Sequence, residues 1–387
     1  KKVVRGLDEL FPNGKAMPTT SLDFASPELH VFPQRERTSP LGLTAQELGY
    51  WVNAMSDGAY AADYWSGSDE IDLTILAGRD EASLCEFVGA MRGCDNYCSY
   101  CIVPYVRGRE RSRPVASIVR EVESLVGLGT REVTLVGQNV NSFDDGGEGF
   151  AELLASVSAI DGLCRIRFAT SHPRDLSDEV INAVASLDKV CEHIHLPVQS
   201  GSSDVLASMN RSYSRDDYIA LAGRIRDAVP GVALTTDIIV GFPGETHEQF
   251  LETVTLMEQI RFDSAFMFRY SVREGTRAAL LVDDVPEKEK IARLETIIEL
   301  QNRVTSEVNE RLVGSLAEVL VEGPSQKNDE RLFGRSRTGK AVVFPGSRKL
   351  VGSVVCVRIS AASAWTLHGT DPRPAPERPG ERPCGSQ

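Results

Sequence analysis

The 387-residue chain lacks several features, and each absence excludes a class of protein. No run of about 18 uncharged apolar residues is present, which excludes a membrane-spanning helix. The first five residues, Lys1 to Arg5, are basic but are followed by no apolar segment, and no initiator Met precedes them. We therefore expect a cytoplasmic protein without a secretory signal, and a trimmed or incomplete N-terminus. A hydrophobic content of 42% with 25% charged residues excludes disorder of the whole chain.

Cysteine is absent from residues 1–84, and residues 1–85 contain no motif that we can identify. Three of the eight cysteines then stand within eight residues, as Cys94, Cys98 and Cys101. A structural zinc site needs four ligands, and the nearest histidine is His172. Three thiolates in one loop suit a 4Fe-4S cluster that keeps one iron open. A zinc knuckle that borrows a remote ligand is the alternative.

From residue 86 onward the chain alternates between short apolar strands and amphipathic helices. This alternation predicts an α/β fold with a parallel sheet. Six strands are too few for a closed eight-unit barrel and fit an open or partial one. The predicted strands are 86–90, 132–136, 165–169, 193–196, 234–240 and 264–270. Helices are predicted near 115–125, 177–186, 215–228 and 248–259.

A long helix from residue 286 to about 312 closes this region, which we place at 86–315. Its predicted apolar face carries Ile291, Leu294, Ile298, Gln301, Val304 and Val308. Residues 316–370 change to a period of two with glycine turns, which predicts a small all-β barrel. The tail 371–387 has five prolines in seventeen residues, and we expect it to be disordered.

The net charge of −13 argues, as an average, against a nucleic acid partner, but the basic residues are concentrated in two places. One is a run of four arginines after the cysteine loop: Arg107, Arg109, Arg111 and Arg113. The other is the terminal barrel, which has eight Lys+Arg against four Asp+Glu. Around one of its turns stand Phe333, Arg335, Arg337 and Lys340. Both patches suit RNA phosphates and unpaired bases, and a solvated charge run is the alternative for the first.

The cysteine spacing, with Tyr100 just before the last cysteine, resembles the radical S-adenosylmethionine (SAM) superfamily. Seven motifs in order are similar to the MiaB type of tRNA methylthiotransferase. They are Met91–Cys94, Tyr100–Tyr105, Arg107–Arg113, Gly137–Ser142, Ala169–Pro173, His195–Gly201 and Ile239–Thr246. The resemblance covers about 87–370 and implies a partial (βα)6 radical-SAM barrel followed by a TRAM domain, a small RNA-binding barrel.

The resemblance also implies the cofactors and their neighbours. Cys94, Cys98 and Cys101 would hold one 4Fe-4S cluster, whose open iron would chelate SAM and reduce it to a deoxyadenosyl radical. This radical would take a hydrogen from an adenine carbon next to the tRNA anticodon, where a methylthio group is installed. The residues expected to contact SAM are Tyr100, Gly137, Gln138, Gln199, Ser200, Arg211, Gly241 and Glu245. Arg211 is expected to pair with its carboxylate, and a surface salt bridge is the alternative. No catalytic residue is identified, and Asp237 is either a paired carboxylate or a substrate contact.

The resemblance leaves several points open. The family expects a second 4Fe-4S cluster, held by three N-terminal cysteines that residues 1–84 do not contain. The first hypothesis is a methylthiotransferase for isopentenyl-adenosine in the tRNA anticodon arm, favoured by Gly137–Asn141. Threonylcarbamoyl-adenosine or a ribosomal protein is an alternative substrate. The second hypothesis is a catalytically incomplete RNA-binding protein. An electron donor such as flavodoxin or ferredoxin and a sulfur source are expected partners.

Overall fold

The computed structural model describes residues 17–19, 28–30, 59–66, 69–75, 83–326 and 328–375, and the chain divides into two units, 1–80 and 81–387. In the first unit, β1 (Met17–Thr19) pairs antiparallel with β2 (Glu28–His30). Strands β3 (Ala59–Ser66) and β4 (Asp69–Ile75) form an antiparallel hairpin. The rest of residues 1–82 lies outside the described part.

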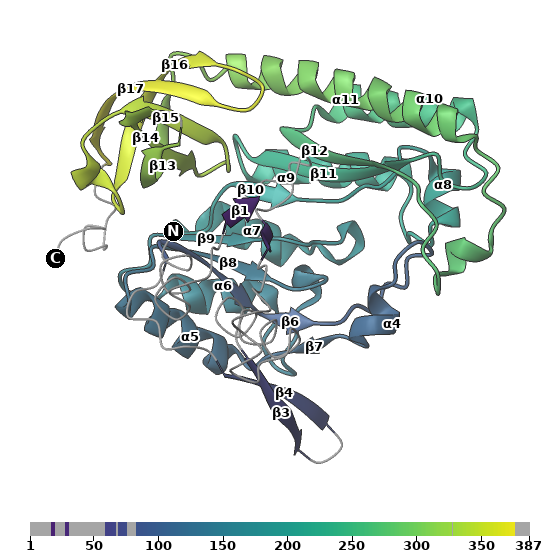
Figure 1. Ribbon diagram of the computed structural model, residues 1–387, viewed down its shortest axis with the longest axis horizontal. Helices are drawn as coiled ribbons and strands as arrows, with labels where there is room; N and C mark the ends of the chain where they lie inside the picture. Colours follow the sequence, from purple (N-terminus) through teal and green to yellow (C-terminus); the bar gives the residue numbers. More distant parts are fainter. Residues whose placement is uncertain are drawn as a thin grey trace, which may run out of the picture. The chain divides into compact units, whose positions relative to one another are not determined.

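Parallel strands form the centre of the second unit (Figure 1). They are β5 (Cys85–Gly89), β8 (Glu132–Val136), β9 (Arg165–Phe168), β10 (His193–His195), β11 (Ala233–Val240) and β12 (Ser264–Arg269). Strands β5, β8 and β9 form one sheet, and β10, β11 and β12 form another, each in sequence order. A parallel bridge between Ile166 and Val190 joins the two sheets just before β10. The six-stranded partial barrel is confirmed.

Helices alternate with these strands along the chain, and the apolar faces of the helices pack on the sheets. They are α5 (Val115–Gly127), α6 (Phe150–Ser158), α7 (Asp178–Ser186), α8 (Ser203–Ser208), α9 (Arg215–Ala228) and α10 (His247–Ile260). Capping boxes start α9 at Ser214 and α10 at Thr246. Helices α6 and α8, both short, were not predicted from the sequence. Over the described residues, no helix is long and apolar enough to cross a membrane.

The long helix α11 (Glu287–Glu310) has the predicted length, and four of the six residues of its predicted face are buried or packed on the core: Leu294, Gln301, Val304 and Val308. Ile291 and Ile298 are 39% and 37% exposed, whereas its buried apolar residues are Ile297, Leu300 and Val304. The helix instead buries Lys290 and Arg293, which pair with Asp283 and Glu245. Because apolar periodicity takes no account of buried ion pairs, the predicted face missed Lys290 and Arg293 and included the exposed Ile291 and Ile298.

A closed five-stranded barrel follows α11, as predicted, in the order β13-β14-β15-β17-β16. Its strands are β13 (Leu316–Ser325), β14 (Asn328–Ser336), β15 (Ala341–Pro345), β16 (Val354–Ala362) and β17 (Leu367–Pro374). Strand β17 continues to Pro374, which pairs with Val355. The prediction of disorder is therefore wrong for residues 371–374, where pairing with β16 outweighs the proline content. Residues 376–387 lie outside the described part.

Candidate active site

The three clustered cysteines lie in one loop between β6 (Met91–Arg92) and α4 (Val103–Arg107). Strand β6 pairs antiparallel with β7 (Arg111–Ser112) and closes the base of the loop. The Cys94 amide donates to the Gly108 carbonyl over 3.3 Å, and the Cys101 amide donates to Cys98 over 3.0 Å. Gly93 has a φ of +79°, and a Cβ there would stand 2.0 Å from the Arg109 carbonyl oxygen. Only glycine fits this position.

The three thiols of the loop are the donors that an iron–sulfur cluster uses. No three His, Cys, Asp or Glu side chains among the described residues have the geometry of a metal site. Burial raises the pKa of the Cys94 thiol to about 11, and burial also raises the pKa of Cys101. These thiols therefore become thiolates only beside a cation. Iron is such a cation, because its binding favours the deprotonated form of its cysteine ligands.

Loops at the carboxyl ends of the strands offer unused polar atoms to a bound molecule. Each of these atoms is buried and without a hydrogen-bond partner within the described part of the chain. They are Asn96 Oδ1, Asn139 Oδ1, Ser171 Oγ, His172 Nε2, Arg211 Nε, Glu245 Oε1 and Tyr270 OH. Since buried polar atoms are rarely left unpaired, this set fits a polar cofactor at the strand edge.

Asp175 joins three of these loops and was not identified from the sequence. Its carboxylate accepts from Asn139 Nδ2 over 2.8 Å, from Asn96 Nδ2 over 3.2 Å and from Arg174 Nε over 2.7 Å. Burial lowers the pKa of neighbouring His172 to about 3, so that its ring is neutral. Asn139 and His172 lie in two of the seven motifs, Gly137–Ser142 and Ala169–Pro173, which was the only sequence evidence that these loops belong to the site. Nothing in the sequence indicates that Asp175 connects them.

Gly137 and Gln138, predicted to bind the cofactor, lie against the cysteine loop. The Gln138 Oε1 atom accepts from the Gly93 amide over 2.6 Å. A Cβ at Gly137 would stand 2.5 Å from the Met91 Cγ atom. Both residues therefore shape the loop that carries Cys94.

Arg211 lies against a cysteine of the loop. Its Nη1 donates to the Cys98 Sγ over 3.4 Å, and its Nη2 donates to the Pro197 carbonyl over 2.6 Å. Its guanidinium also lies over the Tyr213 ring. No carboxylate contacts Arg211 in the described structure, so the surface salt bridge is wrong. Tyr100 packs beside an apolar cluster that includes Tyr270.

The other four predicted cofactor residues are largely engaged in the fold. Gln199 exchanges backbone hydrogen bonds with Asp237 and Ile239 at a φ of +73°. The Ser200 hydroxyl lies 3.3 Å from that of Thr253 on α10.

Gly241 and Glu245 bond to each other. The Glu245 Oε2 accepts from the Gly241 amide over 2.6 Å and from Arg293 Nη1 over 2.7 Å. Burial raises the pKa of Glu245 in spite of these donors. Only its Oε1 is left for a ligand.

The four arginines of the basic run differ in their partners. Arg107 and Arg111 are exposed. The exposed Arg109 pairs with Asp95 over 2.9 Å. Arg113 donates to the Gly89 carbonyl over 2.7 Å and pairs with Glu121 over 2.6 Å. The run is therefore partly structural.

The basic turn of the terminal barrel faces the partial barrel at two of its four predicted positions. Arg337 pairs with Glu192 over 2.7 Å, and Lys340 pairs with Asp263 over 2.7 Å. These contacts correct the expectation of one shared RNA face. Arg335 stays exposed, with its guanidinium over the Phe333 ring and its Nε 3.5 Å from Glu322 Oε1.

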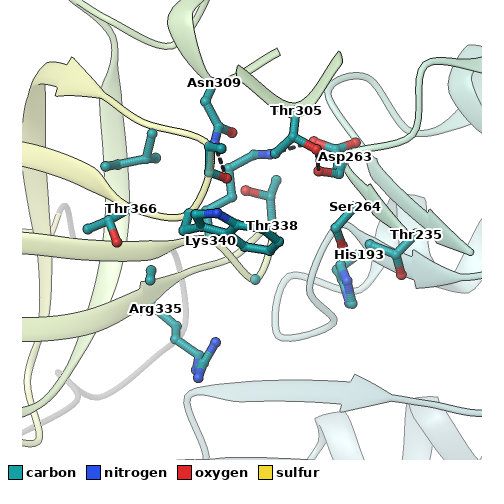
Figure 2. Close-up of a pocket in the computed structure, with 15 residues that line it drawn as sticks. His193, Thr235, Asp263, Ser264, Thr305, Asn309, Arg335, Thr338, Lys340 and Thr366 are labelled. Atoms are coloured by element: carbon teal, nitrogen blue, oxygen red, sulfur yellow. Dashed lines mark hydrogen bonds and ion pairs between the residues drawn. The ribbon is translucent and has the colours of Figure 1, made fainter. Parts of the chain in front are cut away.

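A cavity of about 200 Å³ lies at this junction (Figure 2). His193 and Thr235 of the partial barrel line it, together with Arg335 and Lys340 of the terminal barrel. Figure 2 shows the Lys340 side chain reaching Asp263 across the junction.

Comparisons with known proteins agree with this arrangement. Residues 88–257 match the radical SAM superfamily, and residues 310–370 match the TRAM domain. A tRNA-2-methylthio-N(6)-dimethylallyladenosine synthase from Carboxydothermus hydrogenoformans is 50% identical over 310 residues, which are 79% of this chain and 70% of that protein. The chain belongs to this family. Its members named here are radical-SAM methylthiotransferases of the MiaB type, as the motifs predicted.

Two further synthases of the same name extend the comparison. The one from Syntrophomonas wolfei is 52% identical over 74% of this chain and 65% of its own length. The one from Acetivibrio thermocellus is 48% identical over 82% of this chain and 67% of its own length. This chain thus spans about two thirds of the length of these relatives. Coproporphyrinogen III oxidase from Escherichia coli superposes with a TM-score of 0.46 at 13% identity, over 72% of this chain and 68% of that one.

Proposed function

We propose that this chain methylthiolates N6-dimethylallyl (isopentenyl) adenosine next to the anticodon of tRNA. The observation that carries the proposal is the cysteine loop at the carboxyl edge of a partial barrel, in a chain about 50% identical to synthases of this name. The TRAM match supports an RNA partner. A cytoplasmic location is part of the proposal, since tRNA is modified there.

The residues of this chain would hold the cofactors as follows. Cys94, Cys98 and Cys101 would ligate one 4Fe-4S cluster, which when bound supplies one-electron cleavage of SAM. Arg211 donates a hydrogen bond to the Cys98 sulfur, and the Asp175 network fixes the loops beside it. The unpartnered atoms of Asn139, Ser171 and Glu245 are then available to SAM.

Contact with the anticodon arm would involve the exposed cations of both patches. Arg107, Arg109 and Arg111 lie beside the cysteine loop, and Arg335 with Phe333 lies on the terminal barrel. Guanidiniums bind phosphates and stack on unpaired bases. Flavodoxin or ferredoxin would supply the electron, and a sulfur source would be needed in addition. Threonylcarbamoyl-adenosine and a ribosomal protein are the alternative substrates within the same chemistry.

The absence of cysteine from residues 1–84 favours a second candidate function. The family's second cluster supplies sulfur, and its ligands are not in this sequence. This candidate is an RNA-binding radical-SAM protein that cleaves SAM without inserting sulfur.

Anaerobic reconstitution followed by iron and sulfide determination separates the two candidates. The proposed function predicts cleavage of SAM and a methylthio product on tRNA carrying dimethylallyl-adenosine, detected by mass spectrometry. One cluster with SAM cleavage but without that product would support the second candidate. Failure to bind any cluster with all three loop cysteines intact would contradict both.

A further inference from the structure

The inner face of the partial barrel carries exposed aromatic rings beside a partly buried pair of polar side chains. On β12, Met267 packs on the core, whereas Phe266 and Phe268 are 63% and 52% exposed. Successive side chains of a strand point to opposite faces, so both rings lie on the inner face. On β5, at the other edge of the arc, Val88 is fully buried and Phe87 is 74% exposed. The same alternation places Phe87 on the inner face.

A histidine–aspartate pair lies among these rings. His195 Nε2 stands 3.3 Å from Asp237 Oδ1, and His195 Nδ1 stands 3.0 Å from the Thr235 hydroxyl. The His195 ring lies edge-on to Phe266, with 6.2 Å between the ring centroids. Asp237 is directly opposite Phe266 in the register of β11 and β12. With His195 on one oxygen, Asp237 keeps its second oxygen for another donor.

This face is continuous with the cysteine loop. Ile239, two residues beyond Asp237, is directly opposite Phe268. Ile239 packs on the apolar cluster to which Tyr100 also contributes, and Tyr100 adjoins Cys101. A molecule against Phe268 would therefore lie on the side of the barrel where the cluster loop begins.

We propose that Phe266, Phe268 and Asp237 receive the purine base to be modified, and that the two rings read its N6 substituent. This inference rests on the proposed function. Aromatic rings suit the plane of the base and the apolar dimethylallyl group. The free oxygen of Asp237 accepts the single N6–H that this purine retains, and His195 holds the carboxylate in place. His195 is thus a positioning residue, which acts on the base only through the Asp237 carboxylate.

The test measures binding of two anticodon stem-loop RNAs to the full chain after cluster reconstitution. One RNA carries dimethylallyl-adenosine next to the anticodon, and the other carries unmodified adenosine. We expect Phe266→Ala and Phe268→Ala each to reduce the preference for the first RNA about tenfold, because each removes apolar contact with the dimethylallyl group. We expect Phe266→Leu to restore part of that preference. Leu251→Ala, at a residue of helix α10 that is 45% exposed, is the control and leaves the preference unchanged.

Asp237→Asn is expected to weaken binding of both RNAs about tenfold and to leave the preference between them unchanged, since both purines carry an N6–H. If the native chain binds both RNAs equally, the proposed function fails. If it discriminates and the alanine variants discriminate equally well, this inference alone fails. Lower melting temperatures of the alanine variants with unchanged discrimination would show that the rings are covered within the protein, which also overturns it.

Discussion

Arg167 on β9 donates from Nη2 to the Ser336 carbonyl over 2.7 Å, which ties the two barrels together across 169 residues of sequence. Its Nη1 donates to the Arg337 carbonyl over 2.8 Å, and its Nε pairs with Glu132 over 2.8 Å. Arg165, two residues earlier, donates to the Arg335 carbonyl over 2.7 Å. Two buried arginines therefore hold the β14–β15 turn against the partial barrel.

Replacing Arg167 by Met is expected to destabilise the protein by about 3–5 kcal/mol, because the buried Glu132 loses its closer cationic partner, keeping only Arg165 at 3.8 Å, and two carbonyls lose their donor. Chemical unfolding measures the loss. Arg224→Met, which removes an exposed pair with Asp178, is the control and should cost no more than about 1 kcal/mol. Equal effects in the two variants would contradict the role of Arg167 at the junction.

Replacing Arg211 by Met is expected to lower the reduction potential of the reconstituted cluster and the amount of iron retained. The reason is that Arg211 brings a positive charge and a hydrogen bond to the Cys98 sulfur, and both favour the reduced, more negative cluster. Redox titration followed by electron paramagnetic resonance measures the potential. Arg303→Met, at a surface pair with Glu258, should leave it unchanged. A potential that does not move in the Arg211 variant would show that this contact does not tune the site.

The buried imidazole of His193 is expected to make the folded protein less stable at acidic pH. Burial lowers its pKa from 6.5 to about 3 in the folded protein. Between these values the unfolded chain binds more protons, so the stabilisation is complete above pH 6.5 and is lost as the pH falls toward 3. At pH 5 the loss from this group is about 2 kcal/mol, since each pKa unit corresponds to 1.36 kcal/mol.

Unfolding at pH 7 and pH 5 measures the total loss, to which His172 also contributes because burial lowers its pKa to about 3. His193→Gln should therefore remove about half of the measured loss. His247→Gln, at an exposed position, is the control and should retain the native dependence. A variant at His193 that stays as acid-sensitive as the native chain would show that the imidazole is not held neutral.

Arg335→Ala is expected to weaken binding of an anticodon stem-loop RNA. It should also reduce the slope of log affinity against log salt concentration by about 1, which corresponds to the loss of one phosphate contact. The exposed guanidinium over Phe333 is the reason. Titrations at several salt concentrations measure the slope. Arg303→Ala removes an exposed cation from the partial barrel and serves as the control. Identical slopes for the native chain and the Arg335 variant would exclude this arginine from the RNA contact.

The sequence by itself determined the features that depend on local pattern. Three cysteines in eight residues and six apolar strands alternating with helices were sufficient to predict an iron–sulfur loop on a partial barrel. The position before the loop also requires a glycine. The backbone of Gly93 is in the left-handed region, and a side chain there would collide with the Arg109 carbonyl.

The tertiary structure decided which charged and polar groups pair with one another. Arg337 and Lys340 looked like RNA contacts, yet Glu192 and Asp263, far away in sequence, bind them. Ser200 looked available to a cofactor, yet Thr253 engages it, and Arg293 engages one of the two oxygens of Glu245. A buried charge must find its partner wherever the fold places one, and no local pattern records that choice.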